Sequence, residues 1–223
     1  MNARYKAVIF DFDGTLVDSL EDIAAAMNDA LEAHGFPALP PGEYRSRVGW
    51  GFFALADLVL PEGARTEENS RKLGSHAGRF LEELPAEKSL SKPYPGIREL
   101  LAELKSRRIK TAVLSNKFDS LLSRAAGELF PPLAFDAVCG QRPGIAPKPD
   151  PAAVWEMLAE IGRSPHETIF VGDSEIDMET ARNSGCYPLG VSWGFRSRDE
   201  LAKAGAARII DRPGELWDLV GGR

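Results

Sequence analysis

The sequence predicts an α/β fold: a Rossmann-like, mostly parallel sheet with helices on both faces, carrying a small all-helical cap inserted after the first strand. Short β-branched apolar runs alternate with helical patterns through most of the 223 residues. Strands that alternate with helices favour a parallel sheet covered on both faces. A long stretch after the first apolar run breaks this alternation and shows helical patterns only, which indicates an insertion.

The expected strands are short apolar runs, typical of strands buried on both faces of a sheet. The first run, 6–10, ends at an acidic turn that contains Gly14. Pro151 begins one of the expected helices, because proline is favoured in a first turn. The expected strands are 6–10, 109–114, 135–139, 168–172, 187–191 and 208–210, and the expected helices of the core are 96–107, 151–161, 175–184 and 198–204.

The insertion is expected to form a cap over the ligand-binding edge of the sheet. Its helical patterns lie near 19–34, 42–60 and 66–84, and prolines and glycines mark the breaks between them. We expect residues 19–91 to form the cap domain, and residues 1–18 and 92–223 to form the α/β core. Open α/β sheets bind ligands outside the carboxyl ends of their strands, so an insertion after the first strand lies over that place.

Composition narrows the possible functions. The chain is 43% hydrophobic and 27% charged, which is typical of a globular protein, and its net charge is −6. An acidic chain of this kind offers no electrostatic footprint for nucleic acid or an anionic membrane, so neither is expected as a partner. Residues 1–6 lack the apolar run of a signal peptide, and no stretch has the ~20 apolar residues of a membrane span. We expect a cytoplasmic protein; its oligomeric state, monomer or homodimer, stays open.

The first chemical motif is Asp11-Phe12-Asp13-Gly14-Thr15 at the end of the first strand. Like charges buried side by side are costly unless a cation lies between them. Carboxylate oxygens suit Mg²⁺, which binds a few carboxylates together with water and substrate phosphate. The alternative, a turn with two solvated aspartates, is disfavoured by the apolar strand that precedes the motif.

A second acidic motif, Gly172-Asp173-Ser174-Glu175-Ile176-Asp177, again follows a strand and opens a helix. Asp173 would lie beside the first pair if the two strands are neighbours, and Asp177 would face the same point from the first helical turn. Acidic residues are also favoured at helix N-termini for electrostatic reasons alone, which explains Asp177 but not Asp173.

Two further motifs supply groups that bind anions. Ser115 and Asn116 follow the strand 109–114 and can donate a hydroxyl and a backbone amide to a phosphate. Lys148 lies between Pro147 and Pro149, just before a helix, where a lysine can neutralise a phosphate oxygen. Each motif is weak alone, because Ser-Asn pairs are common in turns and most lysines are solvated.

Together these four motifs resemble the haloacid dehalogenase-like phosphohydrolase superfamily, and the similarity runs from Lys6 to about Leu219. The segments GDSEIDMETARNSGC and GVSWGFRSRDEL are similar to the phosphoglycolate phosphatase-like branch with a helical cap. The resemblance implies a Mg²⁺-dependent phosphomonoester hydrolase that acts on a small phosphorylated metabolite, with phosphoglycolate as the first expectation.

The resemblance also implies roles for individual residues. Asp11 would attack phosphorus and form an aspartyl-phosphate, while Asp13 would act as acid and base. Asp11, the backbone carbonyl of Asp13, and Asp173 would hold Mg²⁺, with Asp177 in or just outside its coordination sphere. Ser115, Asn116 and Lys148 would bind the phosphoryl oxygens. The resemblance further implies that a cap segment containing Gly49 and Trp50 faces the substrate, with plain packing as the alternative; whether Lys117 points into the cleft stays open.

Three other functions are alternatives to this interpretation. A sugar phosphomutase has the same core, but the segment Arg47-Val48-Gly49-Trp50 lacks the arginine after glycine that we would expect in its cap. A carbon–halogen hydrolase needs no metal and typically lacks the second aspartate, so Asp13 and Asp173 argue against it. A binding module on a decayed core is disfavoured because the expected catalytic positions are intact, although a fold alone never proves a function.

Overall fold

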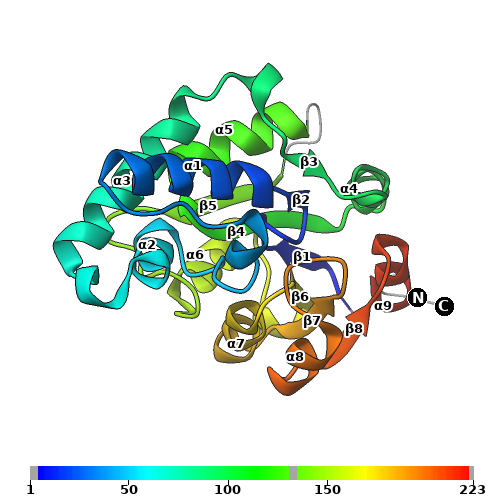
Figure 1. Ribbon diagram of the computed structural model, residues 1–223. Helices are drawn as coiled ribbons and strands as arrows, with labels where there is room; N and C mark the ends of the chain where they lie inside the picture. The colour runs from blue at the N-terminus through cyan, green and yellow to red at the C-terminus, as the bar shows by residue number, and fades with distance from the viewer. Residues whose placement is uncertain (1–4, 131–134, 221–223) are drawn as a thin grey trace.

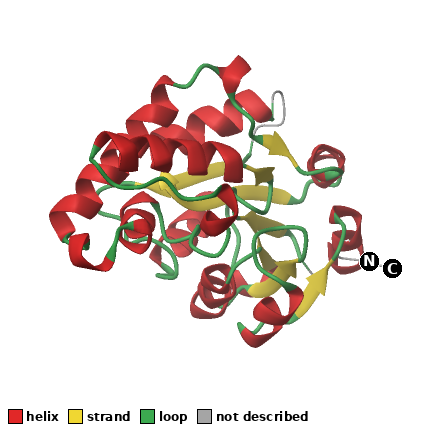
Figure 2. Ribbon diagram, in the orientation of Figure 1, coloured by secondary structure: helices red, strands yellow, loops and turns green. Residues whose placement is uncertain are grey.

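The computed structural model describes residues 5–130 and 135–220. Its centre is a six-stranded sheet in the order β5-β4-β1-β6-β7-β8, and every neighbouring pair in it is parallel. Figures 1 and 2 show this sheet between layers of helices, which confirms the predicted fold class. The strands are β1 (Ala7–Phe10), β4 (Lys110–Phe118), β5 (Ala137–Gln141), β6 (Thr168–Gly172), β7 (Tyr187–Val191) and β8 (Arg208–Ile210).

Alternation along β1 divides the core between the two faces of the sheet. Val8 and Phe10 belong to an apolar cluster with residues of α4, α5 and α9, whereas Ala7 and Ile9 belong to a cluster with residues of α6 and α7. Successive side chains of a strand point to opposite faces, so a continuous apolar run fits a strand covered on both sides. The helices of the core are α4 (Ile97–Ser106), α5 (Asp119–Leu129), α6 (Ala152–Glu160), α7 (Glu175–Ser184), α8 (Arg198–Lys203) and α9 (Trp217–Val220).

The helical insertion leaves and rejoins the core through two paired strands. β2 (Val17–Asp18) and β3 (Lys92–Pro93) are antiparallel, with Val17 opposite Pro93 and Asp18 opposite Lys92. The helices between them pack around an apolar cluster of their own, which includes Met27, Leu31 and Leu73. They are α1 (Leu20–Ala33), α2 (Phe52–Val59) and α3 (Glu67–Glu83), with short 3₁₀ turns at Pro41–Tyr44, Glu62–Ala64 and Ala86–Lys88.

We refer to residues 19–91 as the cap. These limits, and the division from a core of 1–18 and 92–223, stay a prediction, although the paired strands β2 and β3 lie at the same places. The core ranges also include residues 1–4, 131–134 and 221–223, which lie outside the described part of the chain.

Two sequence expectations about secondary structure need correction. The helix expected over 42–60 is wrong for residues 45–51, because Gly49 (φ 131°) and Gly51 (φ 86°) take left-handed backbone conformations that end regular helix, and α2 begins only at Phe52. The helix α5 and the extension of β4 to Phe118 were not expected. Among the described residues, no helix is both long enough and apolar enough to cross a membrane.

Candidate active site

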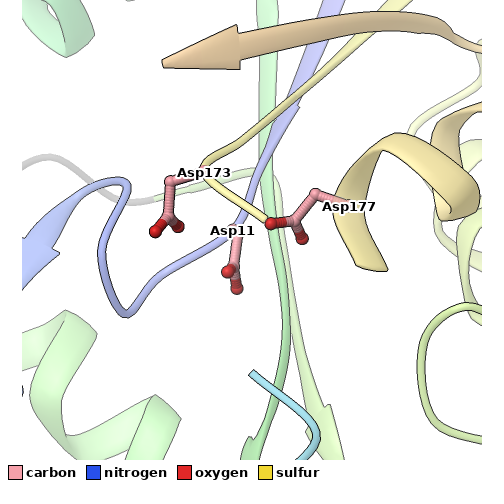
Figure 3. Close-up of side chains that lie close together, drawn as sticks. All are labelled: Asp11, Asp173 and Asp177. Atoms are coloured by element: carbon pink, nitrogen blue, oxygen red, sulfur yellow. The ribbon is translucent and has the colours of Figure 1, made fainter. Parts of the chain in front are cut away.

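Three carboxylates from separate segments meet at the carboxyl edge of the sheet. Asp11 follows β1, Asp173 follows β6, and Asp177 lies in the first turn of α7. β1 and β6 are parallel neighbours, so their ends lie side by side. Carboxylate oxygens of all three residues lie within 4.8 Å of one another, and Figure 3 shows the three side chains gathered in one place. The structure therefore brings together the acids that the sequence suggested as metal ligands.

Lys148 joins two of these acids. Its Nζ lies 2.8 Å from Asp11 Oδ1 and 2.7 Å from Asp177 Oδ1, and its side chain is only 2% exposed. Burial alone would lower the pKa of Lys148, but the charges of Asp11 and Asp177 outweigh that effect and raise the pKa, so the ammonium stays charged. Lys148 thus places a fixed positive charge directly beside an oxygen of Asp11.

The acids also perturb one another. Burial, and then the neighbouring charge of Asp177, raise the pKa of Asp11 well above its usual value, against the opposing effect of Lys148. Burial and the charge of Asp177 likewise raise the pKa of Asp173 to about 7, although the Phe195 amide and the Thr15 hydroxyl oppose the rise. Crowded, desolvated carboxylates of this kind are stabilised in the ionised form by a cation.

The donor set fits a divalent cation with a preference for oxygen. Asp11, Asp173 and Asp177 are 5%, 1% and 0% exposed, so their oxygens are withdrawn from bulk water. With all three ionised, the single charge of Lys148 leaves the group net negative. Carboxylate oxygens without thiolate or imidazole partners suit Mg²⁺ or Ca²⁺ more than zinc. One oxygen of Asp177, Oδ2, already accepts from the backbone and hydroxyl of Ser174 at 3.1 and 2.6 Å.

Asp13 lies apart from this cluster and has different partners. Its Oδ1 accepts a hydrogen bond from Ser19 Oγ at 2.6 Å, and Lys117 Nζ lies 3.1 and 3.3 Å from its two carboxylate oxygens. Gly14 makes the turn after it with φ 86°, and a Cβ there would overlap the Asp173 carboxylate. Asp11 and Asp13 therefore face one cavity with separate environments, a condition that allows two acids different roles.

Ser115 and Asn116 lie in the C-terminal part of β4, and the side chain of Asn116 binds other residues of the protein. Its Nδ2 donates to the carbonyls of Lys148 (3.1 Å) and Gly49 (3.0 Å), and its Oδ1 accepts from the Lys148 amide at 2.8 Å. Asn116 thus fixes the backbone that carries Lys148 and contacts the cap. Ser115 is 4% exposed and lines the cavity beside Asp11.

The cap forms the other wall of this cavity. Gly49 and Gly51 line it together with an apolar wall of Ile23, Val48, Phe52 and Leu55. Trp50 is 39% exposed and is not among the residues that line the cavity, in contrast to its neighbour Gly49. The cavity measures about 30 Å³, room for roughly two water molecules.

A second cavity of about 230 Å³ shares Asp13 and Lys117 with the first. It lies between the C-terminal end of α3, the linker that contains Ser89 and Ser91, and α5. Arg124 of α5 lines it and donates to the carbonyls of Glu82 and Leu84 at 2.7 Å, so a core residue binds the end of a cap helix.

Three further residues contact the acids of the site, two of them without a role predicted from the sequence. Ser19 and Lys117 contact Asp13, and the hydroxyl of Thr15 donates to Asp173 Oδ1 at 2.9 Å. The sequence left open whether Lys117 points into the cleft, and the structure places its Nζ 3.1 Å from Asp13 Oδ1. Ser19 and Thr15 gave no signal in the sequence, since their partners depend on the turn after β1.

Comparisons with known proteins identify the family of the chain. The model of the haloacid dehalogenase-like hydrolase family matches residues 8–191. A phosphoglycolate phosphatase from Chromobacterium violaceum is 31% identical over 99% of both chains, and one from Aquifex aeolicus is 33% identical over 85% of this chain and 86% of its own. The crystal structure of a predicted phosphoglycolate phosphatase from Haemophilus somnus superimposes with a TM-score of 0.85 at 26% identity, covering 96% of this chain and 97% of that one.

Proposed function

The chain belongs to the haloacid dehalogenase-like hydrolase family and is a phosphatase, and we propose that it hydrolyses the monoester of a small phosphorylated metabolite with Asp11 as nucleophile. The observation that carries the proposal is the convergence of Asp11, Asp173 and Asp177 within 4.8 Å, with Lys148 against Asp11. Phosphoryl transfer requires mainly positioning and neutralisation of charge, and this cluster can supply both.

In the proposed reaction, a carboxylate oxygen of Asp11 attacks phosphorus and the bond from phosphorus to the alcohol oxygen breaks. Asp13, in its protonated form, gives its proton to the leaving alcohol. Water then attacks the phosphorus of the aspartyl-phosphate while Asp13 takes a proton from that water. The bond between phosphorus and the Asp11 oxygen breaks, which releases inorganic phosphate and restores the Asp11 carboxylate. Lys148 and the Ser115 hydroxyl neutralise and orient the phosphoryl oxygens, and the backbone amide of Asn116 is the third proposed donor.

We propose that Asp11, Asp173 and the backbone carbonyl of Asp13 hold Mg²⁺, with Asp177 as a direct ligand or a partner just outside. Bound Mg²⁺ would neutralise charge on the phosphoryl group. We further propose phosphoglycolate as the substrate, because relatives that match most of this chain are named phosphoglycolate phosphatase.

The test is phosphate release from p-nitrophenyl phosphate with and without Mg²⁺. We expect Mg²⁺-dependent turnover in the native protein, none in Asp11→Asn, and native turnover in Asp18→Asn, which changes an exposed acid outside the site. A panel of phosphomonoesters that includes 2-phosphoglycolate then ranks substrates. Absence of turnover over the whole panel would refute the proposed function, and interconversion of hexose phosphates without phosphate release would favour a mutase.

A further inference from the structure

One residue, Phe195, connects the cap to the metal-binding cluster. It lies in the loop 192–197 that follows β7, so the chain assigns it to the core. Its side chain, however, is 7% exposed and belongs to the apolar cluster of the cap, together with residues of α1, α2 and α3. The loop belongs to the core, but the side chain of Phe195 anchors it in the cap. The catalytic cavity lies between the core and the cap.

The backbone of Phe195 has partners on both sides. Its N–H donates to Asp173 Oδ2 at 2.7 Å, while its carbonyl accepts from Arg45 Nε of the cap at 3.0 Å. Arg45 also donates to the carbonyl of Gly194 at 2.5 Å. Thr15 holds the other oxygen of Asp173, Oδ1, from within the core. The direction of Asp173 thus depends on one contact from the core and one from a loop that the cap binds.

A second arginine crosses the same boundary in the opposite direction. Arg196 of the core donates to the carbonyls of Arg45 (2.7 Å) and Val48 (3.0 Å) in the cap, and its Nε binds Glu175 Oε2 at 2.9 Å. Its side chain is 4% exposed. When the cap is docked, the loop is held by its side-chain anchor and by two reciprocal sets of hydrogen bonds.

Space beside the loop is too tight for independent movement of Asp173. A Cβ added to Gly194 would overlap both the Asp173 side chain and the Gly14 carbonyl. A displacement of the loop therefore moves the Phe195 amide away from Asp173 or pushes the carboxylate itself. Release of the cap removes the attachments that oppose such a displacement.

We propose that Phe195 is a positioning residue that couples docking of the cap to the orientation of Asp173, and hence to metal binding. The inference rests on the proposed role of Asp173 as a metal ligand. Coupling of two equilibria is reciprocal, so a docked cap strengthens metal binding and a bound metal favours the docked cap by the same factor. The site is then complete only when the cap covers it.

The experiment measures the affinity for Mn²⁺ without substrate, by the electron paramagnetic resonance signal of the free ion. Arg45→Ala removes one of the two sets of hydrogen bonds between the cap and the loop, and the exposed position of Arg45 allows the variant to fold. Arg47→Ala is the matched control, because Arg47 lies in the same segment and pairs with Glu43 inside the cap. We expect Arg45→Ala to weaken Mn²⁺ binding about fivefold or more, the lower range of coupling between sites, and Arg47→Ala to leave it unchanged.

The sign of the change separates positioning from charge. Removal of a nearby cation through electrostatics alone would strengthen Mn²⁺ binding, since arginine repels the metal. Unchanged or tighter binding in Arg45→Ala would overturn the inference. Absence of Mn²⁺ binding in the native protein, or binding that persists in Asp173→Asn, would instead refute the proposed metal site. Weaker binding restricted to Arg45→Ala supports the coupling.

Discussion

The carboxylate of Asp22 joins the two chain segments that connect the cap to the core, and its removal should destabilise the protein. Asp22 lies in the first turn of α1 and is 7% exposed. It accepts from Ser89 Oγ (2.7 Å), Leu90 N (3.0 Å), Ser91 N (3.0 Å) and Ser91 Oγ (2.5 Å). Burial alone would raise the pKa of Asp22, but the hydrogen bonds of Ser91, Leu90 and Ser89 outweigh it and lower the pKa.

The cost of Asp22→Ala follows from these four donors. A hydrogen bond to a charged group contributes about 1.5–3 kcal/mol, but the donors lie in a partly exposed linker and regain water when the acceptor is removed. We therefore expect a loss of about 2–4 kcal/mol in the free energy of unfolding, less than the sum of four separate bonds. For a chain of this size the melting temperature should fall by about 5–15 °C.

Urea unfolding at neutral and acid pH measures this effect. A carboxyl whose pKa is lowered by folding stabilises the protein above its unfolded pKa of about 3.9, and the contribution disappears as pH falls through the lower folded value. The difference between native protein and Asp22→Ala should therefore shrink in strong acid. Glu21→Ala, an exposed acid in the same turn, should change stability by at most about 0.5 kcal/mol. The reasoning would be refuted if Asp22→Ala left the free energy of unfolding unchanged, or if the difference in stability between the two proteins grew in acid.

The remaining predictions concern the site. Lys148→Met leaves Asp11 and Asp177 buried without their cation, so thermal unfolding with chelator should show a loss of about 3–5 kcal/mol, part of which Mg²⁺ restores. Chelation should abolish phosphate release, and excess Mg²⁺ should recover it. Gly51→Ala should lower kcat/KM about tenfold, because a residue with a Cβ at φ 86° and ψ 169° costs of order 1–3 kcal/mol and this Cβ would lie 2.9 Å from the Asn116 carbonyl, which opposes cap docking.

Each of these has its own comparison. Lys105→Met, in α4 and away from the site, is the control for loss of a lysine; equal stability of Lys148→Met and native protein in chelator would contradict the account of the buried cluster. Full activity in chelator would exclude a metal requirement. Gly42→Ala adds a Cβ to the same cap at a place where no atom lies within 4 Å. An equal loss of kcat/KM in both glycine variants would show that the effect does not depend on the contact with Asn116.

Much of the fold could be predicted from sequence because its strands are buried on both faces. Such strands read as continuous apolar runs, and the acids that follow 6–10 and 168–172 marked the edge where ligands bind. The helix expected over 42–60 was wrong in its middle because Gly49 and Gly51 obey tertiary constraints: each lies against side chains or backbone of the core. The periodic pattern of apolar residues along the segment does not reveal that contact.

The site was predictable where its residues follow strands and not where they meet across the cap boundary. Asp11, Asp173 and Lys148 each end or precede a regular element, so the topology alone places them together. Ser19 reaches Asp13 through a turn, and Phe195 reaches Asp173 through a loop. Their contacts are determined by the path of irregular backbone. Irregular backbone has no repeating sequence pattern from which its path could be predicted.

The pairing of β2 with β3 has a consequence for how such enzymes diversify. Neighbouring strands in a sheet lie about 4.8 Å apart, so the chain departs for the cap and returns from it at almost the same point. The whole insertion therefore takes the place of the turn in a hairpin formed by β2 and β3. Its length and sequence can therefore change through mutation or recombination without altering strand order or the acids on the strand ends. New specificities could arise by exchange of this one module while the chemistry beneath it is inherited intact.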